Sequence, residues 1–371
     1  MTFRVLAQDS NNRITKFSMR RPVNMHGHVR KGPQMEAVVG QSAVIYGSMI
    51  VMPNTGPITT VPDALAYQEE IVSALIRQGF SPERARRFPR MTLYVHPGTS
   101  EQDVRQAKKH GFAGFKFYPK NPRHGTTGSQ YGVPSLRDIE APIAMMTKYG
   151  VELMVHGESA IHDQILDLER HFVADELLWV TRKYPRLRLS IEHMTTREAV
   201  AFVIANTTGT IRGTITPQHL WYTINSLFEG GLRPFRYCLP LYKYPSDQAA
   251  LMQAILDGAH NISAGDDTAP HPKFGPAGQA KLADFGCAGA YVAPVSLSLY
   301  AEVFDGVGAL NQCFENFMSI NGPRGSGLQP CDDEIVVERK PWTVPDDYPY
   351  GDNRVVPLGA GETREWQLVT D

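Results

Sequence analysis

Eight short apolar runs alternate with helical patterns from near the start of the chain to about residue 305, and this alternation limits the folds that the chain can adopt. Strands separated by helices pair in parallel, because each crossover helix returns the chain to the same end of the sheet. Eight such units predict a closed (β/α)8 barrel of the TIM type, an α/β fold, rather than an open sheet. The runs lie at residues 22–29, 44–52, 91–95, 114–118, 151–155, 187–191, 213–216 and 261–264.

The segments between these runs carry helix signals. Residues 64–77 place Ala64, Tyr67, Ile71 and Leu75 at the three-to-four spacing of an amphipathic helix. Similar patterns cover 100–110, 135–149, 160–184 and 246–257.

We expect a single domain over residues 1–371, with the barrel at about 18–320 and a C-terminal extension at about 321–371. The extension is rich in Gly, Pro and Asp and contains strand-like pieces at 334–337 and 366–369. We expect it to pack against the barrel rather than to form a separate catalytic unit.

Composition excludes several classes of function. The 371 residues carry 37 Lys and Arg against 38 Asp and Glu, so the net charge is −1. Nucleic acids and anionic membranes need a concentrated positive field, which this balance does not supply. The first residues lack the apolar stretch of a signal peptide, and the four scattered cysteines form no C-x-x-C pair. We therefore expect a cytoplasmic protein that acts on a small molecule, with no nucleic-acid or membrane partner.

Potential metal ligands follow the strand-like runs. In a parallel barrel the functional groups project from the carboxyl ends of the strands, so residues at these ends meet at one rim. Five runs deliver such groups: His26 and His28 from the first, Lys116 from the fourth, His156 from the fifth, His193 from the sixth and Asp267 from the eighth.

The spacing of His26 and His28 is typical of two ligands that act together. Side chains two positions apart on a strand lie on the same side, so both imidazoles can enter the barrel mouth. Imidazole and carboxylate ligands suit zinc and similar divalent ions, and we interpret the four rim histidines as metal ligands. His96, His110, His124, His162, His171 and His260 are interpreted as ordinary surface or core residues, and His219 remains undecided.

Lys116 lies inside an apolar run, where burial of an ammonium group is costly. One interpretation is a buried lysine paired with a carboxylate. The other is a lysine that reacts with carbon dioxide to form a carbamate bridging two metal ions. The residues alone do not choose between them.

Seven ordered blocks resemble the shorter bacterial and yeast-type dihydroorotases of the amidohydrolase superfamily. They are His26-Gly27-His28-Val29-Arg30, Met52-Pro53-Asn54, Lys116-Phe117-Tyr118-Pro119, Val155-His156-Gly157-Glu158, Glu192-His193-Met194-Thr195-Thr196, Thr216-Pro217-Gln218-His219-Leu220 and Asp267-Thr268-Ala269-Pro270-His271. Their order and spacing agree from about residue 18 to the closing residues 359–363.

The resemblance implies two zinc ions per subunit. His26, His28 and Asp267 would hold one ion, His156 and His193 the other, and carboxylated Lys116 would bridge them. Asp267 would also act as the catalytic acid and base.

The resemblance also implies a substrate site and a reaction. Arg30, Asn54 and His271 would grip a ring carboxylate. The backbone around Cys238-Leu239 and at Ala288 would meet the pyrimidine edge, and Thr126 and Thr127 would belong to a mobile lid loop. The implied reaction is the reversible cyclisation of N-carbamoyl-L-aspartate to L-dihydroorotate in pyrimidine biosynthesis, by a possible homodimer. The alternatives are another cyclic amidase, such as a dihydropyrimidinase or hydantoinase, and a non-catalytic structural relative.

Four residues depart from the pattern of that family. Asn24 stands where an Asp is usual, Met25 stands where an aromatic residue is frequent, and Gly27 replaces a larger apolar residue. Asp266 adds an acid beside Asp267, and we expect it to point to the opposite side because neighbours on a strand alternate.

Overall fold

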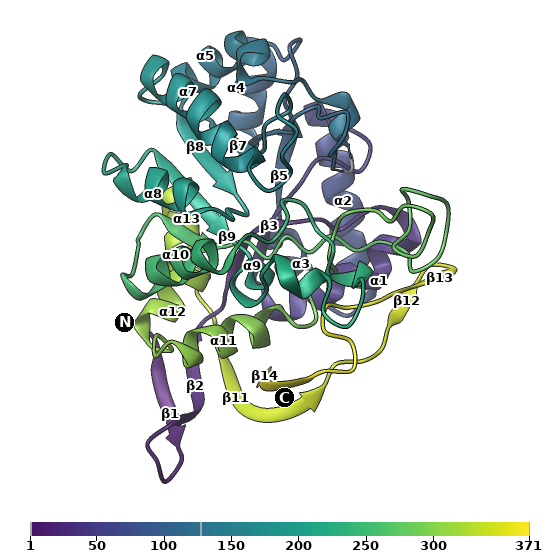
Figure 1. Ribbon diagram of the computed structural model, residues 1–371, viewed down its shortest axis with the longest axis vertical. Coiled ribbons are helices and arrows are strands. Elements are labelled where there is room, and N and C mark those ends of the chain that lie inside the picture. Colours follow the sequence, from purple (N-terminus) through teal and green to yellow (C-terminus); the bar gives the residue numbers. More distant parts are fainter. Residues whose placement is uncertain (1, 127, 371) are drawn as a thin grey trace.

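The computed structural model describes residues 2–126 and 128–370, and the predicted barrel forms its centre (Figure 1). Eight strands pair in sequence order, and every pair is parallel. They are β3 (Val23–Gly27), β4 (Ser48–Val51), β5 (Pro89–Tyr94), β6 (Gly114–Phe117), β7 (Glu152–His156), β8 (Arg188–Glu192), β9 (Ile211–Ile215) and β10 (Ile262–Ala264). Each predicted run overlaps one of these strands.

The last strand returns to the first. β10 lies beside β3, and the backbone N–H of Asp267 donates to the carbonyl of His26 at 3.0 Å. The N–H of His28 in turn donates to the carbonyl of Thr268 at 3.0 Å. These bonds join the two ends of the sheet at the rim, and the predicted (β/α)8 barrel is confirmed.

Helices connect the strands and cover the barrel. The α-helices are α1 (Gly32–Ile45), α2 (Val61–Arg77), α3 (Pro82–Arg87), α4 (Glu101–Lys109), α5 (Glu140–Tyr149), α6 (Leu168–Phe172), α7 (Leu178–Lys183), α8 (Arg197–Ala205), α9 (Pro217–Trp221), α10 (Pro245–Leu256), α11 (Ser296–Gly306), α12 (Gln312–Glu315) and α13 (Asn321–Ser326). Shorter 3₁₀ turns are η1 (Ser129–Tyr131), η2 (Leu136–Ile139), η4 (Ile224–Leu227) and η5 (Pro234–Arg236), and η3 (Val173–Leu177) and η6 (Asn316–Ile320) are π-helical.

Helix α2 forms for the reasons that its sequence suggests. The four residues predicted to share a face, Ala64, Tyr67, Ile71 and Leu75, are all buried. The side chain of Thr60 accepts a hydrogen bond from the backbone N–H of Asp63 and so caps the first turn. None of the described helices combines the length and apolar character that crossing a bilayer requires.

Two local predictions were wrong. Residues 44–46 do not belong to the second strand, because α1 continues to Ile45 and the strand begins only at Ser48. An apolar run does not distinguish the buried end of a helix from a buried strand. The helix predicted over 160–184 begins only at Leu168, and the preceding residues form a loop.

The two ends of the chain meet in a second sheet. β1 (Arg4–Gln8), β2 (Ile14–Arg20), β11 (Glu334–Thr343) and β14 (Thr363–Leu368) pair antiparallel in that order. Figure 1 shows the β1–β2 hairpin projecting from the body and β11 and β14 passing beneath α11. A separate short hairpin joins β12 (Tyr348–Tyr350) and β13 (Asn353–Val355).

Trp366 anchors the C-terminal extension. It is fully buried, and its ring meets the ring of Phe17 edge-on at 5.3 Å between centroids. The extension therefore contacts the N-terminal strands, a pairing that its strand-like pieces alone could not specify.

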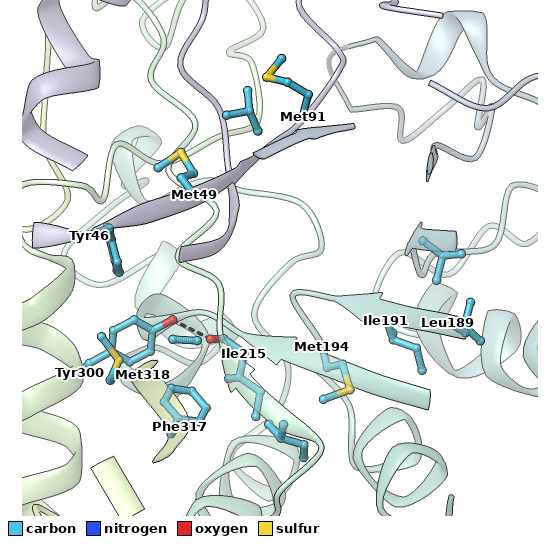
Figure 2. Packing of buried hydrophobic residues seen from close by; sticks show 14 of the residues in the cluster. Tyr46, Met49, Met91, Leu189, Ile191, Met194, Ile215, Tyr300, Phe317 and Met318 are labelled. Carbon is cyan, nitrogen blue, oxygen red and sulfur yellow. Dashed lines mark hydrogen bonds between the residues drawn. The ribbon is translucent and has the colours of Figure 1, made fainter. Parts of the chain in front are cut away.

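Buried side chains fix the outer helices to the strands that carry the rim. The hydroxyl of Tyr300, from α11, donates to the carbonyl of Ile215 at the end of β9, at 2.7 Å (Figure 2). The ring of Phe317 packs against Tyr300 at 5.5 Å between centroids. This packing holds the carboxyl end of β9 in place.

Candidate metal centre and substrate pocket

The predicted ligands converge on the carboxyl ends of the barrel strands. His26 lies in β3, Lys116 in β6 and His156 at the end of β7. His193 directly follows β8, and Asp267 follows β10. All five side chains are buried, so the barrel removes them from bulk water as well as bringing them together.

His26, His28 and Asp267 form the tightest group. One ligand atom from each lies within 4.8 Å of the others. The Asp267 Oδ1 atom lies 3.1 Å from His28 Nε2 and 3.4 Å from His26 Nε2. Two imidazole nitrogens and a carboxylate oxygen at this spacing suit a borderline divalent ion.

The other two histidines lie beside this group. The ring of His193 is centred 4.9 Å from that of His26 and 4.7 Å from that of His156. Burial, together with the nearby His156 and Lys116, lowers the pKa of His193 well below its usual range. Burial also lowers the pKa of His28 to about 4. Both imidazoles are therefore neutral near pH 7, the form that binds metal.

Two buried nitrogens in the cluster lack hydrogen-bond partners among the described residues: Lys116 Nζ and His193 Nδ1. Buried polar atoms are nearly always hydrogen-bonded, so each unpaired one calls for an explanation. A metal ion beside His193 and a modified Lys116 would account for both. The donor set therefore fits a metal centre.

Lys116 is fully buried, and burial lowers the pKa of its ammonium to about 8, although Glu192 and Asp267 act in the opposite direction. The described residues supply no ion pair or hydrogen bond to its Nζ atom, which disfavours the interpretation of a carboxylate-paired lysine. The aromatic ring of Tyr118 lies 5.2 Å from Nζ.

The backbone is strained at the same rim. Arg30, His193 and Asp267 have φ angles of 60°, 43° and 47°, in the left-handed region that residues other than glycine rarely adopt. Each such residue costs about 1–3 kcal/mol, and such residues are concentrated at active sites. The strain marks this rim as functional independently of the ligand chemistry.

Two carboxylates behind the histidines had no role in the sequence interpretation. Glu192 Oε2 lies 2.9 Å from His26 Nδ1, and Glu158 Oε2 lies 2.7 Å from His156 Nε2. Burial alone would raise the pKa of Glu192, but the contact with His26 lowers it to about 2. A carboxylate that holds the second nitrogen of a metal-binding histidine is common. In the sequence, only position marks these two carboxylates: Glu192 directly precedes His193, and Glu158 lies two positions after His156.

The unusual residues Asn24 and Asp266 contact each other. Asn24 Nδ2 donates to Asp266 Oδ1 at 2.6 Å, and the Asp266 N–H donates to Asn24 Oδ1 at 3.0 Å. Burial raises the pKa of Asp266 to about 6. Asp266 thus faces Asn24, whereas Asp267 faces His26 and His28, so the two acids point apart as expected, although both follow the end of β10 instead of lying within the strand.

Gly27 is explained by a neighbour. A Cβ atom at this position would lie 2.9 Å from the Met49 sulfur. Met49 therefore occupies the space that a larger residue at position 27 would need.

The predicted substrate-binding residues line the same cavity as the metal ligands. Six predicted residues line it, namely Arg30, Asn54, Thr126, Leu239, His271 and Ala288, and so do Tyr118, Ala269 and Gly289, which were not predicted. Thr127 lies outside the described residues.

Arg30 and His271 form a polar pair in this cavity. Arg30 Nη2 lies 3.0 Å from His271 Nε2, and Arg30 Nε donates to the carbonyl of Pro270 at 2.8 Å. Burial and the charge of Arg30 lower the pKa of His271 well below its usual range. The guanidinium is therefore the positive group of this pair and can receive an anion.

His219 is a structural residue. It is buried, its Nδ1 lies 2.7 Å from the hydroxyl of Thr216, and its Nε2 lies 2.9 Å from the carbonyl of Pro240. Both ring nitrogens are thus occupied, and the undecided histidine is not among the residues that line the cavity.

Comparisons with known proteins agree with this geometry. No model of a protein family matches the chain. A curated dihydroorotase from Laribacter hongkongensis is 40% identical over 355 residues, which cover 95% of this chain and 99% of the relative.

Solved structures give the same result. The crystal structure of a dihydroorotase from Campylobacter jejuni is similar with a TM-score of 0.83 and 29% identity, over 98% of this chain and 99% of that one. A dihydroorotase from Saccharomyces cerevisiae, in complex with 5-fluoroorotic acid, has a TM-score of 0.82 at 25% identity, over 96% and 99% of the two chains. Identity of this extent over nearly the whole of both chains, on the same barrel, shows that the chain belongs to the dihydroorotase family of metal-dependent cyclic amide hydrolases in the amidohydrolase superfamily.

Proposed function

We propose that this dihydroorotase interconverts N-carbamoyl-L-aspartate and L-dihydroorotate in the cavity at the barrel rim, as a step of pyrimidine biosynthesis. The observation that carries the proposal is the position of Asp267, whose Oδ1 atom lies 3.1 Å from His28 in the cavity that also contains Arg30. An acid–base group, a metal-binding group and an anion-binding group therefore share one small cavity.

We propose two zinc ions per subunit. His26, His28 and Asp267 would hold one, and His156 and His193 would hold the other. The unpartnered Nζ of Lys116 supports a carboxylated lysine that bridges them, because a neutral buried amine can add carbon dioxide. When bound, the ions would lower the pKa of water and polarise the amide carbonyl of the substrate.

Asp267 would move the proton. In ring opening, the oxygen of water adds to the ring carbonyl carbon, the C–N bond breaks, and the amide nitrogen must gain a proton to leave. Burial alone would raise the pKa of Asp267, but hydrogen bonds from His26 and His28 hold it well below its usual range. Asp267 thus begins as a carboxylate, takes a proton from the attacking water and delivers it to the nitrogen. Cyclisation runs the same transfer in reverse.

Arg30, Asn54 and His271 would bind the ring carboxylate. A guanidinium matches a carboxylate through two parallel charge-assisted hydrogen bonds. Dihydropyrimidinase and hydantoinase substrates lack this carboxylate, so a buried Arg30 disfavours that alternative. A non-catalytic relative is disfavoured because all six predicted ligand positions retain residues suited to the role.

The remaining contacts would come from backbone and from a loop. The backbone at Leu239 and Ala288 would meet the amide edge of the ring, since both residues line the cavity. Thr126 and Thr127 would belong to a lid, and Thr126 also lines the cavity.

We further propose a homodimer, a single domain over residues 1–371 and a cytoplasmic location. The contact between the C-terminal extension and the N-terminal strands supports a single domain. The four cysteines form no disulfide, which supports a reducing compartment.

The test is a metal analysis combined with an assay on two substrates. We expect dihydroorotate to be hydrolysed efficiently and dihydrouracil, which lacks the carboxylate, to react far more slowly. Equal or faster turnover of dihydrouracil would refute the assignment.

A further inference from the structure

A second group of metal-ligating side chains lies outside the rim cavity. His162, His171 and Asp175 each offer one ligand atom, and these atoms lie within 4.8 Å of one another. His162 Nε2 lies 3.0 Å from Asp175 Oδ2, and the two imidazole rings stack with their centroids 3.7 Å apart. None of the three lines the cavity that contains His26. The two groups are therefore separate.

The local fold brings these side chains together. His171 in α6 and Asp175 in η3 are four residues apart, so they lie on the same side about one helical turn apart. The π-helical geometry of η3 is uncommon and is frequently found at functional sites. In the continuous helix predicted from the sequence, His162 and His171, nine positions apart, would lie on opposite faces. Residues 160–167 form a loop instead, and this loop allows His162 to lie beside His171.

From this geometry we propose that His162, His171 and Asp175 bind a divalent ion of the zinc class. Two imidazole nitrogens and one carboxylate oxygen form a ligand set that zinc uses when it keeps a position for water. The His162 side chain is 34% exposed and that of Asp175 is 47% exposed, so an ion and its water ligand can reach them.

A bound ion would take the place of the hydrogen bond between His162 Nε2 and Asp175 Oδ2. The two rings are inclined by only 10°, and parallel rings cannot both point at one ion, so binding turns one of them. His162 lies in the loop and is the one able to turn.

A bound ion would restrain the loop that follows β7, the strand that ends at the proposed rim ligand His156. That loop also contacts the segment after β6: Asn121 Nδ2 donates to the carbonyl of Ser159 at 3.1 Å, and Arg123 pairs with Asp163. The same segment contains Thr126, which lines the cavity. A bound ion would therefore stiffen the wall beside the active site without entering it.

Zinc stoichiometry tests the proposal. The full-length protein is equilibrated with Zn²⁺, passed over a desalting column and analysed for metal per chain, alongside His162→Ala, His171→Ala and Asp175→Asn. We expect each variant to hold about one zinc ion fewer than the wild type. His171→Gln, which keeps a polar side chain of similar size, serves if His171→Ala does not fold. His260→Ala, which removes an exposed histidine in a turn, should retain the wild-type content.

Equal zinc in the wild type and the three ligand variants would overturn the proposal, as would an equal loss in His260→Ala, because the metal would then be bound non-specifically. The experiment compares the zinc content of the wild type with that of variants that keep all the rim ligands. The difference in zinc content is therefore independent of how many ions the rim holds, and the proposed function can fail without affecting this test.

Discussion

Glu192 Oε2, at the end of β8, lies 2.9 Å from Nδ1 of His26 in β3, although the two residues are 166 positions apart in the chain. This contact fixes the orientation of the imidazole and leaves its Nε2 atom directed to Asp267, 3.4 Å away. The carboxylate also accepts hydrogen bonds from Ser190 and Thr214. The position of the His26 nitrogen that we propose as a metal ligand therefore depends on a carboxylate that is not itself one of the proposed ligands.

Glu192→Gln should weaken metal binding while leaving the fold intact. Loss of the negative charge lowers the basicity of His26, and such substitutions typically cost about 10–100-fold in metal affinity. Competition with a chelator measures the change. Glu140→Gln, at the surface beside Lys183, is the control and should bind metal as the wild type does. Wild-type affinity in Glu192→Gln would show that the contact has no such role.

His193→Ala or His26→Ala should remove metal and activity together. Each variant deletes a nitrogen from the rim cluster, and we expect a loss of about one ion per chain from the centre. Metal content and turnover of dihydroorotate are measured on the same samples, with His260→Ala as the control. Full zinc content with unchanged turnover in His193→Ala would contradict the ligand assignment.

Arg30→Met should lower kcat/KM for dihydroorotate, because a desolvated charge pair with the substrate is lost. We expect the loss of transition-state binding free energy to be about 2–5 kcal/mol. Metal content should hardly change, because Arg30 contacts Pro270 and His271 rather than the ligand cluster. Arg30→Lys keeps the charge but loses the paired donors. Its kcat/KM should therefore lie between that of the wild type and that of Arg30→Met. If Arg30→Met retained wild-type kcat/KM, the carboxylate would have to bind elsewhere.

Asp267→Asn should lower the rate in both directions of the reaction. The loss should be at least that of a missing acid–base group, which is about 10²–10⁴-fold. Asp266→Asn should cost far less, because Asp266 contacts Asn24 instead of the rim histidines. Rates of ring opening and cyclisation are measured for both variants. An inactive Asp266→Asn beside an active Asp267→Asn would reverse the roles of the two acids.

Reconstitution of the metal-free enzyme should need bicarbonate and should accelerate as the pH rises through about 8. Burial lowers the pKa of Lys116 to about 8, so the amine is mostly protonated at pH 6 and mostly neutral above pH 8. Only the neutral amine reacts with carbon dioxide. Activity is followed after addition of Zn²⁺ with and without bicarbonate at each pH.

Lys116→Arg is the matched control for that experiment. It keeps a cation at the position but cannot form the carbamate, and it should not regain activity at any pH. Recovery of the wild-type enzyme at a rate independent of bicarbonate would contradict a carboxylated Lys116.

Local pattern was sufficient for much of the fold and for placing the proposed ligands at one rim. Strand–helix alternation specifies parallel pairing, and parallel pairing places the end of every strand at one rim. His26, Lys116, His156, His193 and Asp267 could therefore be grouped from the sequence, although they are spread over more than half of the chain. The wrong boundary at residues 44–46 arose because apolar residues do not indicate whether the segment is the end of a helix or a strand.

Tertiary structure decided the contacts between residues that share no local pattern. Barrel closure, sheet pairing and a loop in place of a helix bring four pairs of residues together. These pairs are Glu192 with His26, Asn24 with Asp266, Phe17 with Trp366 and His162 with His171. Periodicity records which side of its own element a residue occupies, because that side is set by backbone geometry. It carries no information about which distant side chain lies opposite, because that depends on how all the elements pack together.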